Sequence, residues 1–426
     1  MNTTSSEADT TPSTNWMDTL WRWADAQQIG ADILPRDPNA LAGLTTLELQ
    51  YQQLTELPPE IGFLSQLTSL NISNNSLTTL PASIANLRQL VSLDVGDNQF
   101  DEVPKEIASL TQLSVLKLYD GEFDSLPDWL GTLTQLEELH LWGNELAQLP
   151  ACLASLTNLR KLYIEENELS ELPDWLGNLT QLCELMIDEN QLTALPASIG
   201  NLTQLTLLDA RSNQLPSLPE ALKHLTQLSH LDISDNHFTA APESIRHFSK
   251  LITLNLGRNP FSSLPDWLGE LRQLKTLSLY RCQLAELPYW LHQLSCLEKL
   301  ELGDNQLAQL PDWIGDMTTL TDLYLWSNRL SALPESIGAL NRLTKLYLKS
   351  NQLAALPETI GNLSALIELD VSDNQLHTLP ERVGELHQLE TLILSDNRLH
   401  TLPESIEDLE NLSKLKLDRN PIMDVG

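Results

Sequence analysis

The sequence predicts an α/β solenoid of stacked repeats, each a short strand followed by a short helical segment. A unit of 23 residues recurs sixteen times from Leu44 to Asn411, without insertion or deletion. Within the unit, apolar residues occupy positions 1, 4, 6, 11, 14, 18 and 21, with Asn at 9 and Pro at 15. A unit this short cannot enclose its own apolar residues, so neighbouring copies must stack and bury them together.

The strand and the turn after it come first in each unit. Positions 4 to 6 read Leu-x-Leu, the alternation of a strand with apolar side chains facing inward. Asn follows at position 9 in fourteen of seventeen copies, and Gln52, Gly121 and Cys282 replace it in the others. An Asn amide can donate to and accept from backbone groups of adjacent turns, so stacked copies predict a buried ladder of amides.

The helical segment begins at Leu-Pro in positions 14 and 15, with Pro in its first turn. The I/L-x-x-L spacing that follows buries one side of this segment. Acid at position 16 in ten of sixteen copies suits the exposed N–H groups of a helix start. Trp at position 17 either packs between adjacent segments, which we favour, or forms an exposed ridge; it occurs as Trp129, Trp175, Trp267, Trp290 and Trp313.

The combined pattern, L-x-x-L-x-L-x-x-N-x-L followed by L-P-x-x-I/L-x-x-L, resembles the leucine-rich repeat family. It looks most like the 23-residue subclass of intracellular Ras-related proteins of animals and plants and of many bacterial proteins. The resemblance covers about nine-tenths of the chain. It implies a horseshoe-shaped solenoid with a parallel sheet on the concave face and short helical or 3-10 segments on the convex face. A sheet face left uncovered is a surface open to a partner.

Four regions are expected along the chain. Residues 1–14 are rich in Ser and Thr and predict a disordered tail. Residues 15–43 predict a helix that caps the core, because Trp16, Leu20 and Trp23 share one helical face, followed by half a repeat. The sixteen repeats fill 44–411, and 412–426 form a partial copy.

Composition and motifs exclude several classes of function. The formal net charge of −33 disfavours nucleic acid and anionic membranes as partners. The four cysteines have no metal-ligand spacing, no Ser or Cys accompanies a strand-face His in a neighbouring copy, and no phosphate-loop or EF-hand motif occurs. We therefore expect a cytoplasmic, non-enzymatic protein without metal or cofactor.

The candidate binding surface consists of strand positions 3, 5, 7 and 8, which face away from the core. Aromatic anchors among charges are typical of protein-binding hot spots, and two clusters have this composition. The first consists of Tyr119, Trp142, Tyr163 and Met186 with Glu138, Glu165, Glu166, Glu184, Asp188 and Glu189. The second consists of Tyr280, Tyr324, Trp326 and Tyr347 with Arg281, Lys299, Lys345 and Lys349.

These clusters predict an interaction scaffold that binds a protein or peptide on the concave face. The carboxylates of the first cluster favour a basic segment as its partner, with Trp142 and Tyr163 as anchors. Two alternatives stay open: a translocated bacterial effector that binds a host protein, and a glycan-binding repeat protein.

Overall fold

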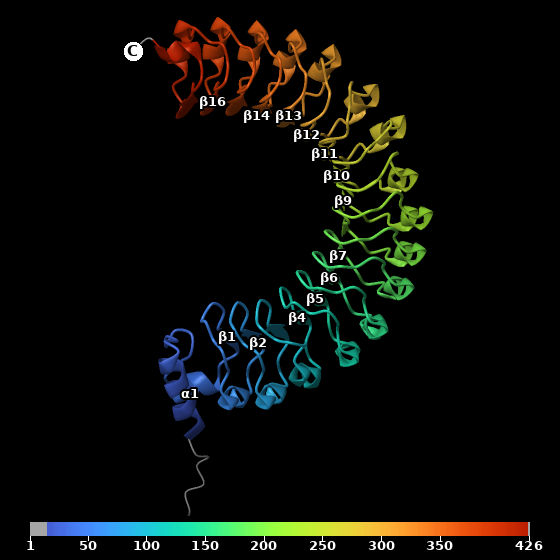
Figure 1. Cartoon of the computed structure of the whole chain (residues 1–426), viewed down its shortest axis with the longest axis vertical. Helices are drawn as coiled ribbons and strands as arrows, with labels where there is room; N and C mark the ends of the chain where they lie inside the picture. The colour runs from blue at the N-terminus through green and yellow to red at the C-terminus, as the bar shows by residue number, and fades with distance from the viewer. Residues whose placement is uncertain (1–14, 425–426) are drawn as a thin grey trace, which may run out of the picture. The chain divides into compact units, whose positions relative to one another are not determined.

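A computed structural model describes residues 15–424 and divides them into two units, one ending at Met186 and the other beginning at Ile187 (Figure 1). The predicted disordered tail, residues 1–14, lies outside the described residues. Every turn of each unit contains one strand and one short 3-10 helix, which confirms the predicted α/β repeat solenoid.

The first unit starts with two α-helices and continues with strands that alternate with 3-10 helices. Its α-helices are α1 (Asn15–Ala26) and α2 (Pro38–Ala42). Its strands are β1 (Thr46–Glu48), β2 (Ser69–Asn71), β3 (Ser92–Asp94), β4 (Val115–Lys117), β5 (Glu138–His140), β6 (Lys161–Tyr163) and β7 (Glu184–Met186). Its 3-10 helices are η1 (Pro59–Phe63), η2 (Ala82–Asn86), η3 (Lys105–Ser109), η4 (Asp128–Thr132), η5 (Ala151–Ser155) and η6 (Asp174–Asn178).

The second unit repeats the same alternation. Its strands are β8 (Leu207–Asp209), β9 (His230–Asp232), β10 (Thr253–Asn255), β11 (Thr276–Ser278), β12 (Lys299–Glu301), β13 (Asp322–Tyr324), β14 (Lys345–Tyr347), β15 (Glu368–Asp370), β16 (Thr391–Ile393) and β17 (Lys414–Lys416). Its 3-10 helices are η7 (Ala197–Asn201), η8 (Glu220–His224), η9 (Glu243–His247), η10 (Asp266–Glu270), η11 (Tyr289–Gln293), η12 (Asp312–Asp316), η13 (Glu335–Ala339), η14 (Glu358–Asn362), η15 (Glu381–Glu385), η16 (Glu404–Asp408) and η17 (Pro421–Asp424).

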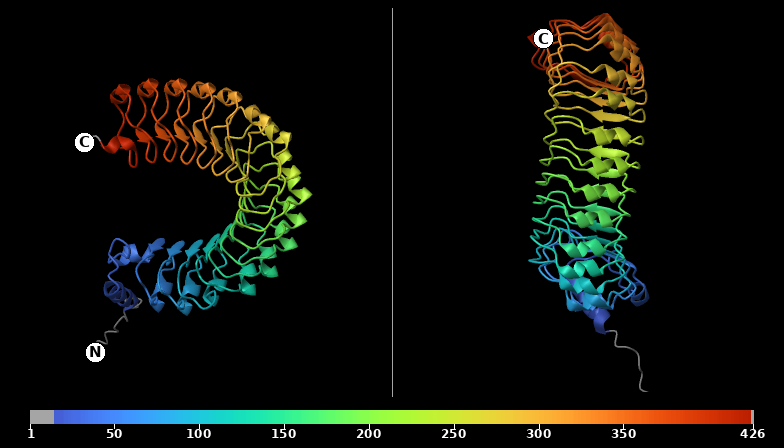
Figure 2. Two further views of the ribbon diagram at one scale, coloured as in Figure 1. Left: turned by 45° about the horizontal axis from the view of Figure 1, so that its top comes forward. Right: turned by 90° about the vertical axis from the view of Figure 1, so that its right-hand side faces the viewer.

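Within each unit, the strands pair in parallel and in chain order, and each residue lies beside the residue 23 positions further on, as Leu47 does beside Leu70. The strands occupy one side of each unit and the 3-10 helices the opposite side (Figures 1 and 2). Most of the repeat leucines between these two layers are buried, so the core is one continuous apolar layer in each unit. The strand face is left uncovered by any other element of the same unit.

The predicted amide ladder is confirmed, and Asn167 illustrates it. Its side chain is 7% exposed, and its Oδ1 accepts a hydrogen bond from the Leu146 N–H at 3.0 Å. Its Nδ2 donates to the carbonyls of Leu141, Ile164 and Glu165 at 3.0–3.2 Å. Each ladder Asn thus joins the turn of its own copy to the turn of the copy before it.

The three copies without the ladder Asn have a different backbone. Position 8 is left-handed in every copy, whereas position 10 is left-handed only after Gln52, Gly121 and Cys282. The left-handed residues at position 10 are Gln53, Glu122 and Gln283, with φ of 56°, 54° and 61°. We call these three places ladder gaps.

The remaining surfaces cover the core. Trp290 is 2% exposed, as the packing interpretation predicts, whereas the other four tryptophans of this row stay partly exposed. Helix α1 buries Leu20 and Ala24, and the Trp16 ring lies 5.4 Å from that of Phe63 in η1. Helix α1 therefore packs against the first turn of the repeat stack.

Candidate binding surface

The first aromatic cluster falls on strands β4 to β7 and the turns after them. We call it the acidic patch, comprising Tyr119, Trp142, Tyr163 and Met186 with Glu138, Glu165, Glu166 and Glu184. Its largest feature is a stack of the Tyr119 and Trp142 rings, 4.6 Å apart and within 2° of parallel. Both rings are half-buried, so part of each ring is exposed at the surface without being part of the core.

A glycine makes room for this stack. A Cβ placed on Gly96 would lie 2.6 Å from atoms of the Tyr119 ring, so the ring covers the backbone of the preceding copy. Gly303 has the same relation to Trp326 in the second unit, where a Cβ would lie 2.5 Å from the indole. A side chain at either glycine would displace the ring, and this pairing of Gly with an aromatic residue was not recognised from the sequence.

The second anchor of the acidic patch, Tyr163, is held by polar contacts. Its hydroxyl donates to Glu184 at 2.6 Å, and its ring lies 4.5 Å from that of His140. Burial and the hydrogen bond to Glu184 raise the pKa of Tyr163, so the phenol stays protonated. Burial lowers the pKa of His140, which leaves the imidazole neutral near pH 7, although its ring nitrogen lies 2.6 Å from Glu138.

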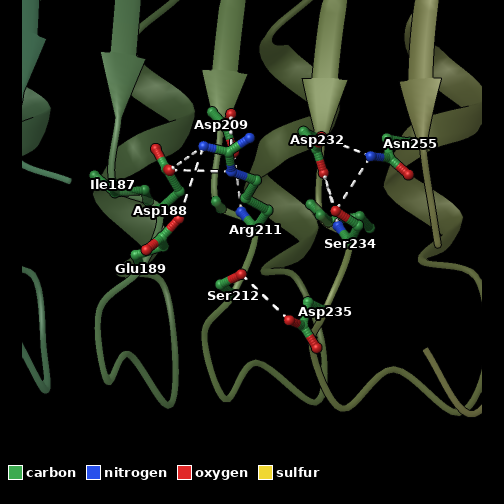
Figure 3. A network of polar contacts seen from close by, with 12 residues as sticks. Ile187, Asp188, Glu189, Asp209, Arg211, Ser212, Asp232, Ser234, Asp235 and Asn255 are labelled. Carbon is green, nitrogen blue, oxygen red and sulfur yellow. Dashed lines mark hydrogen bonds and ion pairs between the residues drawn. The ribbon is translucent and has the colours of Figure 1, made fainter. Parts of the chain in front are cut away.

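Asp188 and Glu189, assigned to the same cluster from the sequence, lie in the second unit and belong to a different network (Figure 3). Asp188 is 1% exposed, and its Oδ2 accepts from Arg211 Nε at 3.1 Å and Nη2 at 2.8 Å. Arg211 also lies 3.9 Å from both Glu189 and Asp209. Asp188 is therefore a buried support for Arg211, whereas Glu189 is an exposed charge.

The same network continues along strands β8 to β10. Burial, together with the charges of Asp188 and Asp232, raises the pKa of Asp209 to about 7. Asp232 accepts a hydrogen bond from Ser234 at 2.6 Å and another from Asn255 at 2.7 Å (Figure 3). Arg211, Asp209 and Asp232 were not identified from the sequence. The signal was present, because opposite charges stood at strand-face positions of adjacent copies.

The second aromatic cluster falls on strands β11 to β14. We call it the basic patch, comprising Tyr280, Tyr324, Trp326 and Tyr347 with Arg281, Lys299, Lys345 and Lys349. Tyr324 and Tyr347 stack at 5.0 Å, within 10° of parallel. Tyr280 and Trp326 approach to 5.2 Å although a whole copy lies between them, because Gly303 of that copy has no side chain to separate them. Lys299 Nζ lies 5.2 Å over the Tyr324 ring, a cation–π contact.

Burial disfavours ionisation of two of the four cysteine thiols. Burial raises the pKa of the Cys282 thiol to about 12, so it is protonated at neutral pH, and burial also raises the pKa of Cys152. Between residues 15 and 424, no three or more His, Cys, Asp or Glu side chains are arranged to hold a metal ion. In the same described range, no helix combines the length and the apolar character needed to cross a bilayer.

Family models match most of the chain. A leucine-rich repeat region model matches residues 35–125 and 105–191. A second leucine-rich repeat model matches residues 180–238, 226–284, 295–353, 318–376, 341–399 and 364–422. A search of curated proteins gave no match.

Several solved structures are similar to this chain. A leucine-rich repeat protein of Leptospira interrogans is 32% identical, with 93% of each chain covered and a TM-score of 0.63. A TDR receptor is 31% identical, with 90% of this chain and 69% of that chain covered and a TM-score of 0.71. The plant peptide hormone receptor RGFR1, in complex with RGF2, is 29% identical, with 89% and 68% covered and a TM-score of 0.66.

Proposed function

Because the chain belongs to the leucine-rich repeat family, we propose that it is a non-enzymatic scaffold that binds a protein or peptide on its strand face. The observation that carries the proposal is the Tyr119–Trp142 stack, which is half-buried on a face that no element of its unit covers. Large rigid aromatic side chains of this kind provide most of the binding energy in many protein interfaces. The similar structure of RGFR1 in complex with RGF2 supports a peptide as ligand.

The acidic patch indicates the chemistry of that ligand. Glu165 and Glu166 follow strand β6, and Asp120 lies in the ladder gap beside the stack. Burial and the nearby charges of Asp97 and Glu166 raise the pKa of Asp120. A further carboxylate would be repelled by these charges, whereas a cation from a partner would be attracted. We infer that the partner segment is basic and places an apolar or aromatic side chain on the Tyr119–Trp142 stack.

We also propose a cytoplasmic location. The four cysteines of the chain are free thiols. Unpaired thiols suit a reducing compartment, where disulfides are rare. Fractionation of cells expressing the tagged chain tests the location, and recovery in the membrane or the medium would contradict it.

A peptide-display selection on the full chain tests the proposed function. We expect enriched peptides that contain Lys or Arg next to an aromatic residue, and Trp142→Ala should weaken their binding by about 2 kcal/mol. Trp129→Ala is the matched control, because Trp129 is also partly exposed but lies in η4, on the opposite side of the unit from the strands. Enrichment of peptides that bind both variants equally well would contradict the proposal.

A further inference from the structure

Three arginines surround one pocket of a chain that otherwise carries a large excess of acid. The pocket has a volume of about 610 Å³ and is lined by Arg258, Arg281 and Arg329, among other polar residues. The chain has 25 Lys and Arg against 58 Asp and Glu, so three guanidinium groups around one hollow stand out. The pocket lies in the second unit, at the turns that follow strands β10 to β13.

Two of the arginines form ion pairs with carboxylates, and the third does not. Arg258 Nη1 lies 3.3 Å from Asp235, and Arg281 Nε lies 3.4 Å from Asp304. The Arg329 side chain forms no ion pair or hydrogen bond with any residue in the described range 15–424, and it is exposed. Three positive charges and two negative charges leave the lining with a net charge of about +1, which favours an anion.

The backbone of the same pocket offers a further donor. Cys282 interrupts the amide ladder here, and Gln283 after it is left-handed, as is Arg281. In copies with the ladder Asn and a residue other than Pro at position 10, the position 10 N–H can donate to the preceding copy, as Gln306 does to Leu284 at 2.8 Å. Among residues 15–424 the Gln283 N–H has no such acceptor. The two preceding N–H groups of this turn are occupied, because Arg281 donates to the Gly303 carbonyl and Cys282 to Asn305 Oδ1, so Gln283 supplies the backbone donor.

We propose that this pocket, which we call the arginine pocket, binds a phosphoryl group. Arginine has five N–H donors and no acceptor, and its planar fork matches two oxygens of a phosphate. Arg329 is unpaired, and Arg281 and Arg258 each have N–H donors beyond those facing their carboxylates. A phosphoryl group carries about −1.5 to −2 charge at neutral pH and three acceptor oxygens, more than a carboxylate supplies. The site goes beyond the proposed function and does not depend on it.

Calorimetric titration of the full chain with inorganic phosphate tests the proposal. The titration is made at an ionic strength of about 0.15 M, where the Debye length is about 8 Å and the acids elsewhere in the chain are largely screened. We expect saturable binding at one site, weakened at least about tenfold when Arg281→Gln and Arg329→Gln are combined. Acetate should bind at least about tenfold more weakly than phosphate, because it has fewer acceptor oxygens and less charge.

Arg398→Gln is the matched control, because Arg398 occupies position 10 as Arg329 does and is also exposed. Equal phosphate affinity in the wild type and the double variant would overturn the proposal, as would an equal loss in the Arg398→Gln control or equal binding of acetate. Degenerate peptides with a fixed phosphoserine, compared with their unmodified serine forms, distinguish the source of the group. Phosphopeptides that bind more tightly than inorganic phosphate identify a modified protein segment, whereas inorganic phosphate alone identifies the free ion.

Discussion

The ladder gaps at Gly121 and Cys282 have the same backbone but opposite charge. In both, a Tyr at position 7 precedes the gap, a glycine occupies position 7 of the copy before it, and position 10 is left-handed. The first reads Tyr-Asp-Gly-Glu and the second Tyr-Arg-Cys-Gln. The first lies in the acidic patch, and the second lines the arginine pocket and shares Tyr280 and Arg281 with the basic patch.

The residues that determine the backbone of these two gaps differ from the residues that determine their charge. The left-handed position 10 accompanies loss of the ladder Asn in both gaps, and a side chain on the preceding glycine would crowd the Tyr119 ring in the first gap and the Tyr280 backbone in the second. Asp120 or Arg281 at position 8, and Glu122 or Gln283 at position 10, then determine the charge. These two positions are solvent-facing, so they vary without cost to the core.

The largest expected effect comes from opening a gap in an ordinary copy. Asn167→Leu removes one acceptor and the donors to three carbonyls, and we expect it to lower the free energy of unfolding by about 3 kcal/mol. Gln191→Leu, at an exposed position, should change it by less than about 0.5 kcal/mol. Urea denaturation measures the free energy of unfolding of both variants. Equal effects would mean that the hydrogen bonds of the ladder Asn do not stabilise the fold.

A smaller effect is expected at Asp209, in a partly buried carboxylate network of the second unit. Its pKa of about 7 in the folded chain is above the usual value of 3.8, so the folded state holds a proton that the unfolded state releases. Wild-type stability should therefore fall as pH rises from about 4 to 7, because ionised Asp209 is disfavoured only in the folded state. Asp209→Asn should remove this loss and be more stable than the wild type above pH 7, by at least about 1 kcal/mol.

The control for Asp209 is Glu48→Gln, an exposed residue at the same repeat position. Urea midpoints measured between pH 4 and 8 give the difference between variant and wild type. A difference that does not change with pH would show that Asp209 ionises normally in the folded chain.

The smallest effect on stability is expected from closing the gap at Cys282. Its Sγ lies 3.5 Å from the Leu256 carbonyl, in the place of a ladder amide, so Cys282→Asn should restore the ladder and stabilise the chain by about 1 kcal/mol. The same variant should weaken phosphate binding, because Gln283 would lose its left-handed conformation. Cys282→Ser keeps the gap and should keep phosphate binding. Unchanged phosphate affinity in Cys282→Asn would show that phosphate binding in the arginine pocket does not depend on the ladder gap.

The repeat period explains why the fold and the ladder could be predicted from the sequence. A uniform spacing of 23 residues places equivalent positions side by side, so Asn167 and its equivalents could be assigned without coordinates. The two surface clusters were identified in the same way, from equivalent positions of neighbouring copies. In the structure the rings of Tyr119 and Trp142 stack, as do those of Tyr324 and Tyr347. Their role in binding stays a prediction.

The missed features depend on contacts between different positions of neighbouring copies. Asp188 was interpreted as an exposed charge, but Arg211 of the next copy covers it. Arg258 and Arg329 were not identified, because one precedes the basic patch and the other lies at position 10, outside the strand positions considered. Whether such side chains meet depends on rotamers and local burial, which the repeat pattern does not determine.

The comparison of the two gaps leads to one central prediction, that the acidic patch and the basic patch bind peptides of opposite charge. One peptide-display selection with wild type, Trp142→Ala and Trp326→Ala as separate baits tests it most directly, with the mean net charge of the lost peptides as readout. We predict that peptides lost with Trp142→Ala are basic and that those lost with Trp326→Ala are acidic. Loss of the same peptides from both variants, or no difference in charge between the two lost sets, would contradict the account.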